Sequence, residues 1–145
     1  MVGKYPAEKL KMYPHLMVGD IAIWEEFLVS VFNVFDSFDY DVHVGEGITP
    51  SKDWSPEIQA MAMALSEKRI DVVGWEGDVP TIIEVKPSAS LSAIGQILCY
   101  RELFSARFPT EARPLIMIVT DFEMPDIRSL SLIFGFRFVI VGGVE

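Results

Sequence analysis

The spacing of apolar residues along the chain changes several times, and each spacing predicts a different element. The first clear run places apolar side chains at intervals of three and four residues, at Ile21, Trp24, Leu28, Val31 and Phe32. That interval marks one face of an α-helix. Asp20 precedes the run and is a suitable N-cap. The pattern therefore predicts a first helix over residues 21–35, after an irregular lead-in over residues 1–19.

Alternating or continuous apolar runs predict five strands, over residues 37–48, 69–75, 81–86, 114–122 and 136–143. The first run alternates apolar and polar side chains, as in a strand with one buried face. The second and third are separated by a short segment that contains Gly77 and Asp78, and both are common turn residues. These two strands are therefore predicted to form a hairpin. The fourth run is continuously apolar, which is typical of a strand buried on both faces.

Three further helices are predicted, over residues 56–68, 88–108 and 124–136. Ser55 and Pro56 suit the N-cap and first position of the first of these, and Pro109 ends the second. The resulting order is α-β-α-β-β-α-β-α-β in a single domain of residues 1–145. This order predicts an α/β fold with a central mixed β-sheet flanked by helices.

The composition is that of a globular protein, because 50% of the 145 residues are apolar and 23% are charged. The formal net charge of −9 makes the chain a poor passive binder of nucleic acid, since neutralising phosphates requires Lys and Arg. The single cysteine, Cys99, excludes an intrachain disulfide, a zinc finger and an iron–sulfur cluster. Its apolar neighbours predict a buried, inert thiol.

The chain shows no pattern that predicts export or membrane insertion. The N-terminal residues lack the continuous apolar segment of a signal peptide. The most apolar span, residues 130–144, is shorter than the ~20 residues that a membrane helix needs, and it contains Arg137. We therefore expect a soluble, cytoplasmic protein with no membrane partner.

Three charged residues interrupt the predicted hairpin at places where apolar side chains would suit a core. Glu84 and Lys86 are two residues apart and therefore point to the same face of their strand. Ile83 and Val85 point to the opposite face. Asp71 lies on the partner strand, with twelve residues between it and Glu84. The hairpin can bring the two carboxylates and the ammonium group together at one end of the sheet.

A divalent cation is one explanation for this group, because two neighbouring carboxylates repel each other unless a positive charge neutralises them. Mg²⁺ prefers carboxylate and carbonyl oxygens together with water, so Asp71, Glu84 and the backbone carbonyl of Val85 form a candidate metal site. Such a metal would lower the pKa of a bound water and stabilise charge on a phosphoryl oxygen, and Lys86 could orient that water. An exposed ion pair at the strand end explains these charges equally well when they are taken alone.

Gln96 and Tyr100 are four residues apart on the next predicted helix and therefore share a face. Taken alone, each has an ordinary explanation, as a solvated amide and a core aromatic residue. The run RID, then IIEVK, then QILCY resembles the PD-(D/E)XK nuclease superfamily, and Q-x-x-x-Y after E-x-K resembles its RecB/Cas4-like branch. The resemblance implies a restriction-endonuclease-like fold. It also implies that Asp71 and Glu84 bind Mg²⁺ or Mn²⁺, that Lys86 activates water, and that Gln96 and Tyr100 contact DNA.

The same superfamily often adds an acidic residue from the first helix, and Glu25 and Glu26 are the candidates here. At about 100° per residue, Glu25 lies beside the apolar face of the predicted helix and Glu26 points nearly opposite. Glu25 is therefore chosen as a further catalytic residue, with a solvated helix carboxylate as the alternative. The implied activity is metal-dependent hydrolysis of DNA. The alternative function is a nuclease-fold module that binds DNA or protein within a larger assembly and does no chemistry.

The acidic charge suggests that the protein acts as a homodimer or with a basic partner protein. The C-terminal segment offers apolar side chains for such a contact, namely Leu130, Leu132, Phe134, Phe136 and Phe138. Other polar residues are weaker candidates for the site and are expected in loops, turns or the solvated lead-in; they are His15, His43, Glu46, Asp121, Lys4, Lys9 and Lys11.

Overall fold

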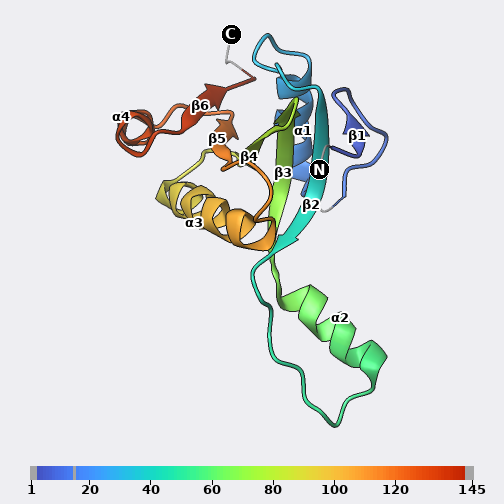
Figure 1. The fold of residues 1–145 in the computed structure, drawn as a ribbon. Coiled ribbons are helices and arrows are strands. Elements are labelled where there is room, and N and C mark those ends of the chain that lie inside the picture. Colours follow the sequence, from blue (N-terminus) through green and yellow to red (C-terminus); the bar gives the residue numbers. More distant parts are fainter. Residues whose placement is uncertain (1–2, 15, 143–145) are drawn as a thin grey trace.

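The computed structural model describes residues 3–14 and 16–142, and its centre is a six-stranded mixed β-sheet (Figure 1). The strands are β1 (Tyr5–Pro6), β2 (Ser37–Val44), β3 (Lys68–Glu76), β4 (Val79–Val85), β5 (Leu115–Thr120) and β6 (Arg137–Ile140). Their order in the sheet is their order in the chain. Strands β1 to β4 pair antiparallel, whereas β4, β5 and β6 pair parallel.

The helices are α1 (Val18–Leu28), α2 (Pro56–Ser66), α3 (Leu91–Arg107) and α4 (Pro125–Phe134). α3 and α4 connect the parallel strands, because parallel neighbours need a crossover connection. None of the helices in the described ranges is long and apolar enough to cross a membrane.

Two apolar clusters fill the two faces of the sheet. On one face, Trp24 and Phe27 of α1 pack with Ile83 of β4. On the other face, Ile97 of α3 packs with Ile82 of the same strand. α1 and α3 therefore cover opposite faces (Figure 1). The predicted α/β class with a central mixed sheet is confirmed.

The first helix differs from its prediction at both ends. It begins at Val18, with Met17 in the N-cap position, so Asp20 lies in the first turn and is not the N-cap. It ends at Leu28, seven residues before the predicted end. Two side chains take over the last backbone carbonyls: Ser30 Oγ donates to the Phe27 carbonyl at 2.7 Å, and Asn33 Nδ2 donates to that of Leu28 at 2.9 Å. These side chains compete with backbone amides for the carbonyls, and the helix therefore ends before the residue that the apolar spacing predicted.

The predicted irregular lead-in is also partly ordered, since it contains β1 and the first residues of α1. The five predicted strands are found near their predicted positions: β3 and β4 are longer than predicted, whereas β2, β5 and β6 are shorter. The last one ends at Ile140, and Gly143 of the prediction lies outside the described residues. At the other end of the sheet, Gly77 closes the β3–β4 hairpin with a φ of 59°, a conformation that glycine adopts readily.

The C-terminal apolar segment is used partly for the core and partly for the surface. Phe136 is buried, and Leu130 and Phe138 pack against the cluster under α3. Leu132 and Phe134 of α4 are instead exposed, with Leu132 at 88%. Apolar side chains therefore remain on the surface of α4, as a contact with a second copy or a partner would require.

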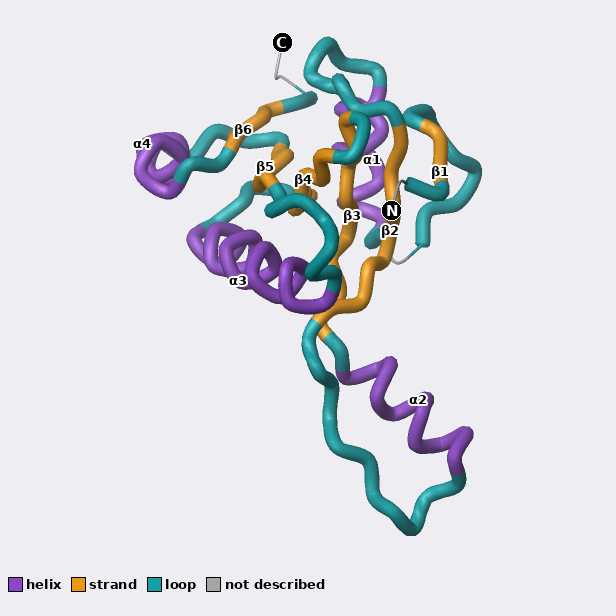
Figure 2. The backbone as a smooth tube through the Cα atoms, in the orientation of Figure 1, coloured by secondary structure: helices purple, strands orange, loops and turns teal. Residues whose placement is uncertain are grey.

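α2 and the loop before it project away from the rest of the molecule (Figures 1 and 2). The helix begins as predicted, because Ser55 Oγ accepts a hydrogen bond from the Ile58 backbone amide at 3.3 Å and Pro56 occupies the first position. No described side chain from residue 46 to residue 66 is buried. Residues 46–66 are called the arm below.

Removal of the arm is expected to leave the sheet folded. Val44 and Lys68 form the last registered pair of β2 and β3. With Asn-Gly in place of residues 46–66, four residues (Gly45, Asn, Gly and Glu67) connect this pair, which is a common hairpin loop length. We expect the midpoint of thermal unfolding, followed by circular dichroism, to change by no more than about 5 °C. A shift well beyond that, or loss of the cooperative transition, would mean that the arm is part of the core.

Candidate active site

A cavity of about 320 Å³ opens at the end of the sheet between α1 and α3. It is lined by five of the residues predicted from the sequence motifs, Asp71, Glu84, Lys86, Gln96 and Tyr100. The other lining residues are Met17, Asp20, Glu67, Lys68 and Arg69. The sequence-predicted residues come from β3, β4, the connection after β4, and α3. The fold therefore brings together side chains that are up to 29 positions apart, between Asp71 and Tyr100.

The connection from β4 to α3 is held by hydrogen bonds to β5. The backbone amide of Lys86 donates to the Val119 carbonyl at 3.0 Å. The amide of Ala89 donates to Thr120 Oγ1 at 3.0 Å, and the amide of Ser88 donates to Asp121 Oδ1 at 2.8 Å. These bonds set where Lys86 leaves the strand. Through its bond to Ser88, Asp121 links the segment after β5 to this connection.

Glu84 is a buried carboxylate, with only 3% of the residue exposed. Burial raises the pKa of its carboxyl from 4.5 to about 8, and the negative charge of Asp71 adds to this effect. The ammonium group of Lys86 lowers the same pKa, and Asp20 raises it. The four charged groups therefore interact electrostatically within one small, poorly solvated space.

Sequence reasoning missed Asp20, as it missed the cavity residues Glu67, Lys68 and Arg69. Asp20 is 7% exposed and lines the cavity, and burial raises the pKa of its carboxyl while Lys86 opposes that rise. The N-cap signal at this position hid its role. Asp20 shares helical spacing with Trp24 and Phe27, which are both fully buried, so an inward-facing carboxylate is compatible with the sequence pattern.

Glu25 was expected in the site, but the structure does not bring it to the cavity. Its Oε2 accepts a hydrogen bond from the Tyr13 hydroxyl at 3.0 Å, and it does not line the wall that contains Asp20. Five residues at about 100° each put Glu25 some 140° around the helix from Asp20. The two carboxylates therefore cannot face the same cavity, and the acidic residue that α1 places there is Asp20.

Arg69 is held in the cavity wall by Asp41 of the neighbouring strand. Its Nε and Nη2 each lie 2.8 Å from a carboxylate oxygen of Asp41. Asp41 has a φ of 55°, a left-handed conformation that is uncommon for residues other than glycine. Tyr40 and Val42 on either side of it pack into opposite faces of the sheet, although a regular strand would put them on the same face. Asp41 therefore both twists β2 and orients Arg69.

The cavity carries three cations, Lys68, Arg69 and Lys86, among its carboxylates. This local set matters because the whole chain has a net charge of −9. Phosphate groups can be contacted here even though most of the charged surface is acidic.

Gln96 and Tyr100 face the carboxylates from α3. Gln96 Oε1 is buried and has no hydrogen-bond partner among residues 3–14 and 16–142, which is unusual for a buried acceptor unless a ligand or water completes it. Burial raises the pKa of the Tyr100 hydroxyl, and the charges of Glu84 and Asp71 raise it further. Tyr100 therefore stays protonated and can donate a hydrogen bond at neutral pH.

The donor chemistry of the cavity suits Mg²⁺ or Mn²⁺, although the carboxylates are not gathered into a complete ligand set. Among the described residues, no group of three or more His, Cys, Asp and Glu side chains is arranged to hold a metal ion. Mg²⁺ commonly takes only one or two carboxylates and keeps several waters. Asp71 and Glu84 could supply these. The Val85 side chain is buried in the cluster under α1, so only its backbone carbonyl is left for a metal.

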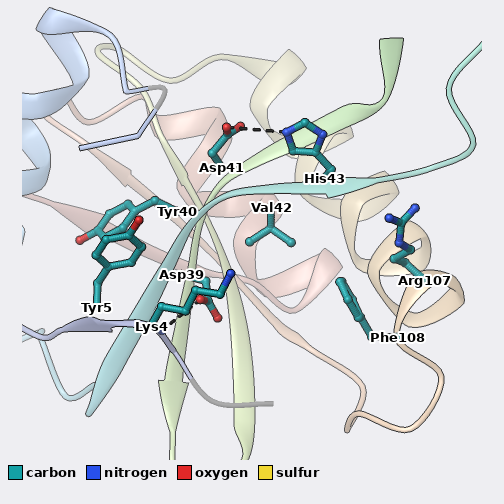
Figure 3. Close-up of a pocket in the computed structure, with 9 residues that line it drawn as sticks. All are labelled: Lys4, Tyr5, Asp39, Tyr40, Asp41, Val42, His43, Arg107 and Phe108. Carbon is teal, nitrogen blue, oxygen red and sulfur yellow. Dashed lines mark hydrogen bonds and ion pairs between the residues drawn. The ribbon is translucent and has the colours of Figure 1, made fainter. Parts of the chain in front are cut away.

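A second cavity of about 320 Å³ lies near β1, β2 and the end of α3, and Figure 3 shows its walls. Its acidic groups already have partners within the protein. Asp39 accepts hydrogen bonds from the Trp75 indole at 2.9 Å and from the Lys4 backbone amide at 3.1 Å. His43 lies 3.7 Å from Asp41. None of the residues predicted for catalysis lines this cavity, and we assign it a structural role.

The remaining candidates lie away from the motif residues. Lys4, Lys9 and Lys11 are exposed, as is Glu46 in the loop after β2, and His15 lies outside the described residues. Cys99 is exposed, which corrects the expected buried thiol. It follows the fully buried Ile97 by two residues, and two residues turn a helix by about 200°.

Comparison with known proteins gives no further assignment. No family model, curated protein or solved structure matches this chain.

Proposed function

We propose that this protein is a metal-dependent nuclease that hydrolyses phosphodiester bonds of DNA. The supporting observation is that Asp71, Glu84, Lys86, Gln96 and Tyr100 line a single cavity, although they were selected from short motifs along the chain. Their shared location is expected for the PD-(D/E)XK arrangement and not for unrelated surface charges. The mixed sheet between α1 and α3 is compatible with a restriction-endonuclease-like fold, which is part of the same proposal.

In the proposed mechanism, Asp71 and Glu84 would hold Mg²⁺ or Mn²⁺ through their carboxylates. The cation would lower the pKa of the attacking water and neutralise charge on the phosphoryl group. Lys86 interacts electrostatically with both Glu84 and Asp20, which keeps its ammonium group close to the reacting phosphate. It orients the water or stabilises the developing negative charge.

The other residues of the cavity bind and position the DNA strand. Arg69, already oriented by Asp41, and Lys68 contact phosphates that flank the scissile bond. The Tyr100 hydroxyl donates a hydrogen bond to a phosphate oxygen because its raised pKa keeps it protonated. Gln96, whose amide oxygen has no hydrogen-bond partner in the part of the chain that the structure describes, completes its hydrogen bonding with the substrate or its water.

The second candidate function is a nuclease-fold module that does no chemistry. The net charge of −9 favours it, as does the lack of a preassembled set of three metal ligands among the described residues. Such a module would act through a homodimer or a basic partner protein. Thermal unfolding with and without Mn²⁺ separates the two functions. An ion at 100 times its Kd stabilises the folded state by about 2.7 kcal/mol, and a silent module without a metal site gains nothing.

The proposed function is tested by incubating the purified chain with duplex, nicked, flap, four-way-junction and single-stranded DNA. Each substrate is combined with Mg²⁺, Mn²⁺ or EDTA. We expect cleavage of at least one substrate with either metal and none with EDTA. If a protein that is folded by circular dichroism cuts none of these substrates with either metal, the nuclease proposal is contradicted and the silent module is favoured.

A matched pair of α1 variants belongs in the same assay. Asp20→Asn is expected to reduce the cleavage rate by about 10- to 100-fold, as is usual when a group that supports a metal site is altered. Glu25→Gln makes the same type of change 140° around the helix and is expected to leave the rate unchanged. The opposite ranking would show that Glu25, and not Asp20, serves the site.

A further inference from the structure

A second hollow adjoins the carboxylate cavity along the outer side of α3. Its volume is about 340 Å³, and it shares Lys68, Gln96 and Tyr100 with that cavity. The rest of its wall includes Gly95, Cys99 and Leu103. We call it the α3 hollow. Tyr100 belongs to both walls, and the two spaces therefore adjoin at this residue.

Gly95 is the feature that keeps the α3 hollow open. It lies inside a helix of 17 residues, where glycine is unfavourable relative to alanine. Packing gives no reason for it, because a Cβ at this position would meet no atom within 4 Å. Neither a turn nor a neighbouring side chain therefore requires glycine here, although it is destabilising relative to alanine inside a helix. The reason suggested by this geometry is space for a ligand beside Tyr100.

The walls of the α3 hollow indicate what kind of ligand fits. They combine an aromatic residue, the aliphatic Leu103 and an exposed thiol with the amide of Gln96 and the ammonium group of Lys68. Small-molecule sites begin at about 300 Å³ and pair an apolar lining with a few polar groups. A flat heteroaromatic group with polar edges, attached to an anionic chain, matches this combination.

We propose, on the basis of the function proposed above, that the α3 hollow receives an unstacked nucleobase of a single DNA strand, next to the phosphate in the carboxylate cavity. Bases within a duplex are stacked and paired and are not available to such a pocket without being flipped out. Stacking of a base on an aromatic residue also provides affinity without positive charge. That suits a chain with a net charge of −9, and it makes single strands, flaps and frayed ends the preferred substrates.

The test compares Gly95→Leu, which fills the α3 hollow, with Gly95→Ala, which adds only a Cβ in open space. Binding is measured in EDTA by fluorescence anisotropy with a (dT)12 strand and with a fully abasic strand of the same length. Phosphate repulsion is common to both strands and cancels in their ratio of affinities. We expect wild type to prefer (dT)12 by about tenfold, Gly95→Ala to weaken that preference and Gly95→Leu to lose it. An unchanged preference in Gly95→Leu overturns the proposal.

A second measurement uses the unaltered protein and its single cysteine. Cys99 lies in the wall of the α3 hollow and is exposed, so N-ethylmaleimide should modify it. We expect (dT)12 to slow this reaction and the abasic strand to leave it unchanged. Equal rates with both strands contradict base binding, even if Gly95→Leu fails to fold.

Neither measurement depends on catalysis, so failure of the nuclease proposal is recognised separately. Base-dependent binding without metal-dependent cleavage would support the α3 hollow and refute hydrolysis. Cleavage without any base preference would support hydrolysis and refute base binding in the α3 hollow.

Discussion

Glu84→Gln is expected to reduce metal-dependent DNA cleavage by about 100- to 1000-fold, the scale seen when a preorganised electrostatic group is removed from an active site. The substitution keeps the shape of the side chain but removes the charge that would hold the cation. Glu84 is buried beside Asp71 and Lys86, so no solvent-exposed carboxylate can take its place. The measurement is the initial rate of cleavage of the best DNA substrate with Mn²⁺.

Glu76→Gln is the matched control for this prediction. Glu76 is an exposed residue at the end of β3, and the same chemical change there is expected to leave the rate unaltered. Cleavage by Glu84→Gln at the wild-type rate would place the chemistry outside the proposed site. Loss of activity in both variants would point to general damage and not to loss of a metal ligand.

The stability of the metal-free protein is expected to fall as the pH rises from about 5 to about 8. The pKa of Glu84 is raised from 4.5 to about 8 by folding, so the folded state binds more protons than the unfolded state between these values. Its favourable contribution is complete below the unfolded pKa and is lost as the pH rises through the folded pKa. Since one pH unit corresponds to about 1.4 kcal/mol, the total loss is a few kcal/mol.

Urea unfolding in EDTA at pH 5.5, 7 and 8.5 measures this dependence. Glu84→Gln removes the titrating group and is expected to flatten the curve, so that it exceeds wild type in stability at pH 8.5. Glu76→Gln should follow wild type. Asp20 also has a raised pKa. The stability of the Glu84→Gln variant is therefore expected to fall with pH as well, but less steeply than that of wild type. Parallel slopes in wild type and Glu84→Gln would mean that Glu84 does not titrate as described.

Added Mn²⁺ is expected to reverse this trend in wild type. The cation binds the ionised carboxylate, so protons compete with it at low pH. Stabilisation by Mn²⁺ should therefore be greater at pH 8.5 than at pH 5.5. A buried carboxylate that weakens the metal-free fold and strengthens the metal-bound one has a functional explanation, because active sites often retain groups that reduce stability.

The sequence alone predicted which motif residues share a face, because that arrangement depends on local geometry, whereas the choice of Gln96 and Tyr100 as site residues came from the resemblance to PD-(D/E)XK nucleases. The two-residue period of a strand puts Glu84 and Lys86 together, and the four-residue spacing of a helix does the same for Gln96 and Tyr100. The hairpin turn at Gly77 brings Asp71 alongside. All five line one cavity.

The acidic residue of α1 could not be chosen in the same way. In the sequence, Asp20 has the residue type and the position of an N-cap, whereas Glu25 lies beside the apolar face of the predicted helix. The choice depends on where the helix starts and how it docks on the sheet. Docking buries Asp20, while Tyr13 from the N-terminal segment binds Glu25.

The amino-acid sequence by itself determined the order and type of most elements and the side chains that share a face, since both follow from periodicity within one segment. Only the tertiary structure decided that Asp20 completes the cavity, that the arm projects, that Cys99 is exposed and that Gly95 opens a second hollow. These features depend on contacts between segments far apart in the chain, which no local spacing encodes.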